Sequence, residues 1–371
     1  MRISVPTEIK NNEYRVALTP SGVNELVRRG HSVFVQSGAG EGSLISDDDY
    51  KAQGAVIVPD AETAWGEGEL LLKVKEPIAA EYQYLRSDQV LFTYLHLAAD
   101  RPLTEILLKN NVTAIAYETV QLDSGMLPLL YPMSEVAGCL APQLGAYTLL
   151  RPSGGRGVLM GAIGGVHNAK VVVIGGGTAG QNAANIALGM GANVTILDTD
   201  LDKLRSTFWR YQNQVQGIAS NSLSISEQVL AADLVVGSVL IPGAKAPKLV
   251  TNDLVSAMKP GSVLVDIAID QGGCFEDSHP TTHADPVFEV HKSLFYCVAN
   301  MPGAVPNTST FALTNATLPY VARIAKAGWR QACKADQALA LGLNTHDGKI
   351  TCAGVAEAFT DLPSTDLNTA L

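Results

Sequence analysis

The chain has 371 residues, of which 47% are apolar and 17% are charged, and its formal net charge is −10. This composition excludes a disordered or collagen-like chain, and at roughly 150 residues per domain the length suggests two or three domains. The acidic balance disfavours a nucleic-acid partner, because such proteins need a basic face. No apolar run approaches the ~18 residues that span a bilayer. The first residues, MRISVPTEIKNNEYR, are too charged to be the apolar core of a signal peptide.

Five cysteines are scattered along the chain, and no two of them form a CxxC pair. An odd number of cysteines without close spacing argues against a disulfide framework and against a zinc site. The pattern is typical of reduced thiols in a cytosolic enzyme. We therefore expect a cytoplasmic protein without a bound metal.

Short apolar runs alternate with helical segments in the N-terminal part of the chain. Thr19 and Ser21 offer N-cap side chains on either side of Pro20, which predicts a helix that ends at Gly30. Strands are expected at residues 3–8, 31–38, 70–77, 89–96 and 112–120. This alternation is typical of parallel α/β units.

The remaining chain continues in the same way. Residues 133–151 are largely apolar and predict a helix, which Pro142 should kink or locally break. Beyond Pro302 the pattern is helical, and the polar residues from about Asp361 predict a loose tail. Further strands, several of them apolar throughout as in strands buried on both faces, are expected at residues 170–174, 193–198, 233–239, 262–270 and 295–301. We therefore predict an α/β fold of mostly parallel sheets flanked by helices.

Residues 175–180, GGGTAG, match the GxGxxG pattern of a dinucleotide-binding turn. A predicted strand precedes the motif and a predicted helix follows it, as in a Rossmann fold. Gly175 makes the tight turn, Gly177 lets the backbone approach a pyrophosphate, and Gly180 lets the helix pack closely on the strand. The helix begins at Thr178 and Ala179, so its unpaired N–H groups point at the phosphates.

Asp198 closes the next predicted strand, about 20 residues after the glycines, where such folds carry an acidic residue. Its carboxylate can accept hydrogen bonds from the hydroxyls of the adenosine ribose, and it would repel a 2′-phosphate. The motif therefore indicates NAD rather than NADP as the cofactor.

A second group of residues lies at or just beyond the ends of later apolar strands. In an open parallel sheet this edge is where ligands bind, but the same residue types also form caps and turns, and the pattern alone does not decide. The residues are Ser238, Val239, Leu240, Asp266, Ile267, Asp270, Val298, Ala299 and Asn300.

Nearly the whole chain resembles the alanine dehydrogenase family. The resemblance rests on VPTEIKNNEYRV, LLLKVKEP, LFTYLHLA and YPMSEVAG in the first 138 residues, and on GGGTAG, VLVDIAIDQGG and VANMPGAVPNTSTFALTNATLPY further on. The NAD-binding subunit of proton-pumping transhydrogenases shares the fold and several of these motifs. Cys139, where many relatives have a basic residue, and Pro142 depart from the family pattern and put the packing of their helix in doubt.

The resemblance implies a two-domain subunit. A substrate domain formed by residues 1–128 and 307–371 would carry an inserted NAD-binding Rossmann domain at residues 129–306. The family typically forms homohexamers and interconverts L-alanine, NAD⁺ and water with pyruvate, ammonium and NADH.

The resemblance also implies roles for single residues. Arg15 would bind the substrate carboxylate, since a guanidinium pairs with a carboxylate through two hydrogen bonds. From the residues alone Arg15 could equally be a surface arginine. Lys75 would hold the carboxylate and polarise the carbonyl of pyruvate, although spacing within the predicted strand does not distinguish it from Lys73.

His96 would be the general acid and base, because a histidine side chain changes charge near neutral pH. A lone histidine in an apolar strand is otherwise more often a core residue. Asp270 would support His96, the attacking water or the amine, and it is the second candidate for the acid and base. Met133 and Asn300 would complete the substrate pocket. Further cofactor contacts are expected at Ser134, Lys203 and Ser220.

Two alternatives remain open at this stage. The chain could be a non-catalytic NAD(H)-binding module related to the transhydrogenase subunit, which would need a membrane partner. It could also carry out the same chemistry on another amino acid, such as glycine, serine or a larger substrate, because one methylene of pocket size discriminates only about 10–200-fold.

Overall fold

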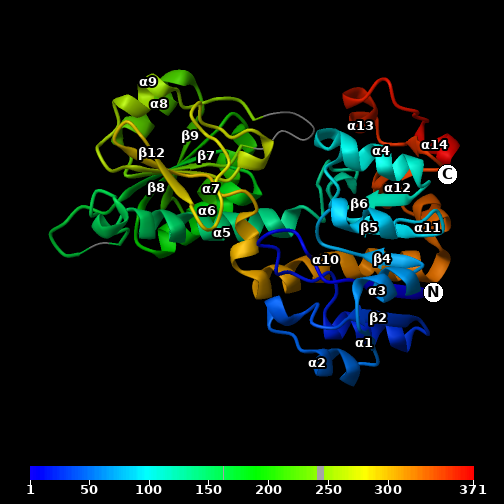
Figure 1. The fold of residues 1–371 in the computed structure, drawn as a ribbon. Helices are drawn as coiled ribbons and strands as arrows, with labels where there is room; N and C mark the ends of the chain where they lie inside the picture. Colours follow the sequence, from blue (N-terminus) through cyan, green and yellow to red (C-terminus); the bar gives the residue numbers. More distant parts are fainter. Residues whose placement is uncertain (162, 240–245) are drawn as a thin grey trace. The chain divides into compact units, whose positions relative to one another are not determined.

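A computed structural model describes residues 1–161, 163–239 and 246–371 of the chain. The chain divides into unit 1, formed by Met1–Met133 and Val305–Leu371, and unit 2, formed by Ser134–Ala304 (Figure 1). Both chain ends therefore belong to unit 1. Each unit is built around one mostly parallel sheet with helices packed on it, which confirms the predicted α/β class.

The described part of unit 1 contains an eight-stranded sheet. Its strands are β1 (Arg2–Val5), β2 (Ser32–Gln36), β3 (Val56–Val58), β4 (Leu70–Leu72), β5 (Val90–Thr93), β6 (Thr113–Ala116), β14 (Leu343–His346) and β15 (Lys349–Ile350). They are ordered β15-β14-β6-β5-β4-β1-β2-β3 across the sheet. The strands β1 to β6 pair in parallel, whereas β14 pairs antiparallel with β6 and β15.

Helices cover this sheet and bury its apolar side chains. They are α1 (Pro20–Arg28), α2 (Asp47–Ala52), α3 (Ala61–Glu67), α4 (Arg101–Lys109), α10 (Pro306–Ala327), α11 (Trp329–Ala335), α12 (Gln337–Leu341), α13 (Ala353–Ala358) and α14 (Leu367–Ala370). The predicted start of α1 is confirmed, because the Thr19 side chain accepts from the N–H of Gly22 and Pro20 opens the helix. Gly30, just beyond its end, has φ +85°.

All five strands predicted in the N-terminal part of the chain are longer than the observed ones, and in two of them a predicted site residue falls beyond the end of the strand. β4 ends at Leu72 and β5 at Thr93, so Lys75 and His96 lie in the segments that follow the strands. Beyond β4 the N–H groups of Val74 and Lys75 donate to the side-chain carboxylate of Glu8. Beyond β5 His96 adopts φ +52°, in the left-handed region. Apolar sequence continues past the point where regular pairing stops, which is why the pattern overestimates the length.

The prediction of a loose C-terminal tail is wrong. The N–H of Ile350 donates to the carbonyl of Pro363, and the N–H of Thr365 donates back to Ile350, at 2.9 and 2.8 Å. Asp361 forms an ion pair of 2.5 Å with Arg101. Backbone pairing does not depend on apolar side chains, so a polar segment can dock without an apolar signal in its sequence.

The described part of unit 2 contains a seven-stranded sheet. Its strands are β7 (Lys170–Ile174), β8 (Asn193–Asp198), β9 (Val215–Ala219), β10 (Leu234–Gly237), β11 (Val263–Asp266), β12 (Val287–Val290) and β13 (Ser293–Tyr296). They are ordered β12-β13-β11-β10-β7-β8-β9, with only β12 antiparallel among the described strands. Leaving out β12, this is the strand order of a Rossmann fold, with its switch point between β7 and β10.

Four α-helices lie wholly within the described part of unit 2: α6 (Thr178–Gly189), α7 (Leu201–Arg210), α8 (Ser222–Ala231) and α9 (Asn252–Ser256). The apolar core on one face of its sheet combines side chains of β7, β10 and β11 with those of α8 and α9. Core strands buried on both faces explain the apolar runs seen in the sequence.

The helix α5 (Tyr131–Thr148) begins in unit 1 and continues into unit 2. Pro142 does not break it, contrary to one of the two expected outcomes. The Cys139 side chain is half-buried, and its Sγ lies 3.9 Å from the side-chain amide oxygen of Asn182 on α6. A side chain at Gly138 would overlap the carbonyl of Ala179, so α5 and α6 pack with their backbones in close approach.

Candidate active site

Four neighbouring strands of unit 1 end at one edge of the sheet, and each is followed by a residue of interest. In the order β6, β5, β4 and β1 these residues are Glu118, His96, Lys75 and Arg15. The strands are parallel, so their carboxyl ends meet at the same edge. The sheet thus brings three of the predicted substrate and catalytic residues to the edge where ligands bind in such folds.

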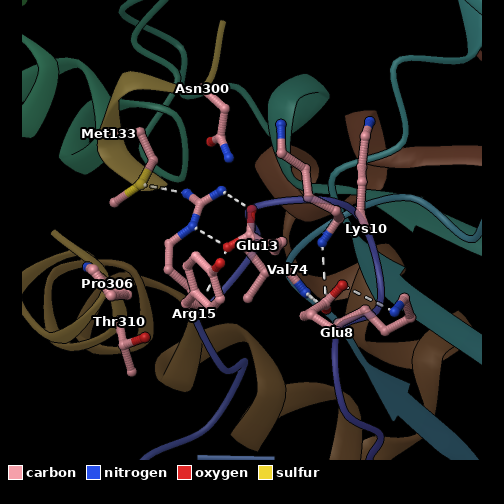
Figure 2. Close-up of polar contacts among 12 residues, drawn as sticks. Glu8, Lys10, Glu13, Arg15, Val74, Met133, Asn300, Pro306 and Thr310 are labelled. Atoms are coloured by element: carbon pink, nitrogen blue, oxygen red, sulfur yellow. Dashed lines mark hydrogen bonds and ion pairs between the residues drawn. The ribbon is translucent and has the colours of Figure 1, made fainter. Parts of the chain in front are cut away.

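Arg15 is buried and forms a two-pronged pair with Glu13 (Figure 2). Its Nε and Nη2 donate to the two carboxylate oxygens at 2.7 and 2.5 Å, and Nη1 contacts the Met133 sulfur at 3.0 Å. Burial acts to raise the pKa of Glu13, but the hydrogen bonds and charge of Arg15 outweigh it and hold this pKa below its usual value. The guanidinium predicted to bind substrate is therefore held in a defined orientation by a neighbouring carboxylate.

The structure distinguishes the two lysines of LLLKVKEP. The Lys73 side chain is fully buried and donates to Glu8 at 3.0 Å and to Glu81 at 2.8 Å. Lys75 is half-buried, its N–H faces the Glu8 carboxylate and its carbonyl accepts from Thr93. The ammonium of Lys73 is thus committed to a buried ion-pair network inside unit 1.

His96 occupies a left-handed turn and its side chain is 47% exposed. Its N–H donates to Glu118 at 2.6 Å, and Glu118 also lies 4.0 Å from Nδ1 of the ring. The ring stacks in parallel on Tyr94, at a centroid distance of 5.9 Å, and the Tyr94 hydroxyl donates to the carbonyl of Leu129. The exposed imidazole is therefore held from two sides and differs from the buried core histidine that the strand pattern also allowed.

In unit 2 the glycine turn has the shape that a dinucleotide requires. Gly175 has φ +104°, and a side chain at Gly180 would overlap the carbonyl of Gly175. A Cβ added at Gly177 meets nothing within 4 Å, so the space in front of the helix is open. No side chain caps the first turn of α6, where Thr178 and Ala179 lie. The open space and the uncapped N–H groups fit a pyrophosphate.

Asp198 ends β8 beside this turn, as predicted. Its carboxylate accepts from the N–H of Gly176 at 2.6 Å and from the N–H of Asp200 at 2.8 Å. Two of the other expected cofactor contacts lie next to it: Lys203 Nζ is 3.6 Å from the carboxylate, and the N–H of Ser220 donates to the Asp198 carbonyl. The carboxylate is therefore oriented by the backbone of the glycine turn.

The remaining predicted residues of unit 2 also follow its strands. Ser238 and Val239 follow β10, Ile267 and Asp270 follow β11, and Val298 and Asn300 follow β13, whereas Leu240 lies outside the described residues. Ser134 lies on α5. These positions agree with the expected carboxyl edge and leave the roles of the residues as predictions.

The two aspartates of VLVDIAID have different surroundings. Asp266 is fully buried and accepts from the N–H of Ala268, the N–H of Cys274 and the Ser278 hydroxyl. Burial raises its pKa, although these hydrogen bonds oppose the shift. Asp270 is exposed on a short 3-10 helix, Ile269–Gln271. Asp266 therefore organises the loop after β11, and Asp270 is the one that can meet a ligand.

The sequence pattern did not single out three carboxylates, Glu8, Glu13 and Glu118, although each contacts a predicted site residue or its backbone. Glu8 and Glu13 are part of the motif that carries Arg15, and their charges close to an arginine were the available signal. Glu118 follows β6, so an acidic residue at the end of an apolar strand was the signal there.

Three further findings concern the residues that the structure describes. Within residues 1–161, 163–239 and 246–371, no helix is both long and apolar enough to cross a bilayer. Over the same residues, no group of three or more His, Cys, Asp or Glu side chains is placed to hold a metal ion. All five cysteines, each of them in the described part, are free thiols.

Comparison with protein-family models gives two matches. The N-terminal domain of alanine dehydrogenase/PNT matches residues 4–137, and the C-terminal domain matches residues 141–353. The chain belongs to the alanine dehydrogenase/PNT family. The two matched segments together contain Arg15, Lys75 and His96 as well as the glycine turn.

Individual relatives extend over nearly the full length. The chain is 63% identical to the alanine dehydrogenase of Mycolicibacterium smegmatis over 99% of this chain and 98% of that protein. It is 62% identical to the alanine dehydrogenase of Mycobacterium tuberculosis over 96% of each chain. A solved L-alanine dehydrogenase superposes with a TM-score of 0.95 at 50% identity, covering 97% of this chain and 99% of that chain. A transhydrogenase from Sinorhizobium meliloti superposes with a TM-score of 0.78 at 25% identity, covering 95% and 99%.

Proposed function

We propose that the chain is an NAD-dependent L-alanine dehydrogenase, an oxidoreductase that acts on a CH–NH₂ group. It converts L-alanine, NAD⁺ and water reversibly to pyruvate, ammonium and NADH. The observation that carries the proposal is 63% identity, over 99% of the chain, to a protein named alanine dehydrogenase. The charged side chains at the carboxyl edge of unit 1 are what a small zwitterionic substrate requires.

The cofactor is NAD, and when bound it accepts the hydride that leaves Cα of the substrate. Gly175, Gly177 and Gly180 form the turn that receives the pyrophosphate, with the first N–H groups of α6 as donors. Asp198 binds the hydroxyls of the adenosine ribose, and its charge disfavours a 2′-phosphate. We assign the other cofactor contacts by the same family resemblance to Ser134, Thr178, Ala179, Lys203, Ser220, Val239, Leu240, Ile267, Asp270, Val298 and Asn300.

Arg15 and Lys75 bind the substrate carboxylate. The pair with Glu13 orients the Arg15 guanidinium, and Lys75 adds a second positive charge for the anion. Lys75 also stabilises negative charge that develops on the carbonyl oxygen of pyruvate. Met133, which contacts Arg15, and Asn300 are further substrate-binding residues in this proposal.

His96 acts as the general acid and base. It takes a proton from the water that attacks the imine carbon and returns a proton to the departing ammonia. Its 47% exposure gives the imidazole access to substrate and solvent, and Glu118 accepts from the His96 N–H and holds the turn that presents the ring. Asp270 supports the amine or the water, and it remains the second candidate for this role.

Family resemblance also suggests properties of the whole enzyme. We propose a homohexamer in the cytoplasm that takes part in the catabolism of L-alanine. Unit 2 would act as the NAD-binding domain, with boundaries near residues 129 and 306, and unit 1 as the substrate domain, formed by residues 1–128 and 307–371.

One assay tests the proposal. Purified protein is mixed with NAD⁺ and L-alanine at alkaline pH, where the substrate amine is deprotonated, and NADH absorbance is followed. Glycine, serine and lysine are measured in parallel. We expect a signal with L-alanine far above the others, and a larger signal with glycine would change the substrate but keep the reaction class.

A second candidate function follows from the transhydrogenase structure that this fold also matches. A chain that binds NADH but turns over none of the four amino acids would be an NAD(H)-binding module of that kind. That result would overturn the proposal, and a search for a membrane partner would follow.

A further inference from the structure

The segment that carries Lys75 extends beyond the regular sheet. β4 has three residues, and its pairing with β1 ends at Leu71, opposite Ser4. On the side of β1, Lys75 therefore lies past the end of the ladder, whereas on the side of β5 main-chain pairing continues to Val74. A residue that must present its side chain to a substrate needs other contacts to hold its backbone in place.

Glu8, which follows β1, supplies those contacts (Figure 2). Its Oε1 accepts from the N–H of Val74 at 2.6 Å and from the N–H of Lys75 at 3.4 Å. A side-chain oxygen thus replaces the main-chain carbonyls that β1 would have offered. On the opposite side the Thr93 hydroxyl donates to the Lys75 carbonyl at 3.0 Å, so the backbone of Lys75 is held from both neighbouring strands.

A buried ion pair keeps Glu8 in place. Its second oxygen, Oε2, accepts from Lys73 Nζ at 3.0 Å, and Lys73 in turn donates to Glu81 at 2.8 Å. The side chains of Glu8, Lys73 and Glu81 are 3%, 0% and 4% exposed. Glu8 and Lys73 are therefore shielded from solvent and held to each other. Buried charges are tolerated only when paired in this way, which makes the arrangement rigid.

We propose that Glu8 is a positioning residue for Lys75: its carboxylate, anchored by Lys73, sets the backbone from which Lys75 reaches the substrate carboxylate. This inference rests on the proposed function for the role of Lys75. The contact by which Glu8 holds the Lys75 backbone does not depend on that function. Glu81 offers a matched comparison, because it is also buried and also accepts from the ammonium of Lys73. Its other oxygen accepts from the N–H of Ile78 and not from that of Lys75.

The test compares Glu8→Ala, Glu8→Gln, Glu81→Gln and the unmodified enzyme. We expect Glu8→Ala to lower kcat/KM for L-alanine on the order of 10², through a higher KM, because a shift of about 1 Å in a positioning group can have this effect. KM for NAD should not change. Glu8→Gln, whose amide oxygen can still accept the two N–H groups, should recover part of the loss. Glu81→Gln should leave KM for L-alanine unchanged.

A merely structural role would reduce the fraction of folded enzyme, which lowers kcat and leaves KM unchanged, and it would affect the Glu8 and Glu81 variants alike. Equal shifts of KM in both, or no shift in either, would overturn the proposal. Hydrogen exchange of the Lys75 amide gives a readout without turnover: it should accelerate in Glu8→Ala and not in Glu81→Gln. If the unmodified chain does not act on L-alanine, the proposed function fails, and the amide exchange still decides the placement. If Glu8→Ala does not fold, KM for L-alanine and the exchange of the Lys75 amide are both measured in Glu8→Gln.

Discussion

In unit 1 the carboxyl edge of the sheet is lined with ionised side chains, whereas in unit 2 the corresponding edge is built from glycines and main-chain N–H groups. Arg15 and Lys73 are held by buried carboxylates at 2.5–3.0 Å. In the glycine turn the decisive features are the φ of Gly175 and the space around Gly177 and Gly180. The first edge depends on charge balance, and the second depends on backbone shape.

Substitutions at the two edges should therefore destabilise the protein for different physical reasons. Removing one partner of a buried ion pair costs about 3–5 kcal/mol, because it leaves the other charge buried and unpaired. A side chain added to a close backbone contact costs ~1–3 kcal/mol or more through overpacking. Substitutions at the ion pairs of unit 1 should thus respond to compensating changes of charge, and those in the glycine turn of unit 2 should respond to side-chain size.

The largest effect is expected at His96. Its replacement by alanine should lower kcat by about 10²–10⁴-fold, the usual contribution of a general acid and base. NADH binding, measured by fluorescence, should remain, because the glycine turn lies in unit 2. His31→Ala is the control, since His31 precedes β2 at the opposite edge of the same sheet. Near-normal turnover of His96→Ala would move the role to Asp270.

The next effect concerns the Arg15–Glu13 pair. Arg15→Ala should lower the free energy of unfolding by about 3–5 kcal/mol and raise KM for L-alanine, because it leaves Glu13 buried without its partner. The double variant Arg15→Ala/Glu13→Gln should regain much of the stability but not the KM. Denaturant unfolding and steady-state kinetics measure the two quantities separately. A double variant as unstable as the single one would contradict the charge-balance argument.

A pair of glycine variants tests unit 2. Gly180→Ala should destabilise the protein by ~1–3 kcal/mol or more, because its methyl group would overlap the carbonyl of Gly175. Gly177→Ala should fold normally, since its methyl group meets nothing within 4 Å, but it should bind NAD more weakly if the pyrophosphate occupies that space. Thermal unfolding and NAD titration distinguish the two outcomes. Unaltered NAD affinity in Gly177→Ala would place the pyrophosphate elsewhere.

The smallest effect is expected at Asp198. Asp198→Asn retains an oxygen for the N–H of Gly176 and removes the charge. The preference for NAD over NADP should fall about fivefold, which corresponds to ~1 kcal/mol of repulsion at the surface. Asp202→Asn on α7, an exposed position paired with Arg205, is the control. An unchanged preference would mean that Asp198 does not face the 2′ position.

The features of unit 2 were more accessible to prediction than those of unit 1. The turn at residues 175–180, the start of α6 and the end of β8 at Asp198 all agree with the sequence pattern, because they depend on neighbouring residues. The expected strands were too long in both units, for example at 70–77 and 89–96 in unit 1 and at 262–270 in unit 2. The N–H groups of Val74 and Lys75, which follow β4, donate to the carboxylate of Glu8. Glu8 is more than 60 residues away in the sequence, so no local pattern predicts this contact.

The sequence by itself determined the α/β class, the glycine turn with its acidic partner, and the family to which the chain belongs. Tertiary structure decided that β4 lies beside β1, which lines up Glu118, His96, Lys75 and Arg15 along one edge. It also decided that Lys73 is buried between Glu8 and Glu81 while Lys75 is half-buried. Turns and caps are set by a few adjacent residues, but strand order and buried ion pairs join segments far apart in the chain, so they exist only once the whole sheet has formed.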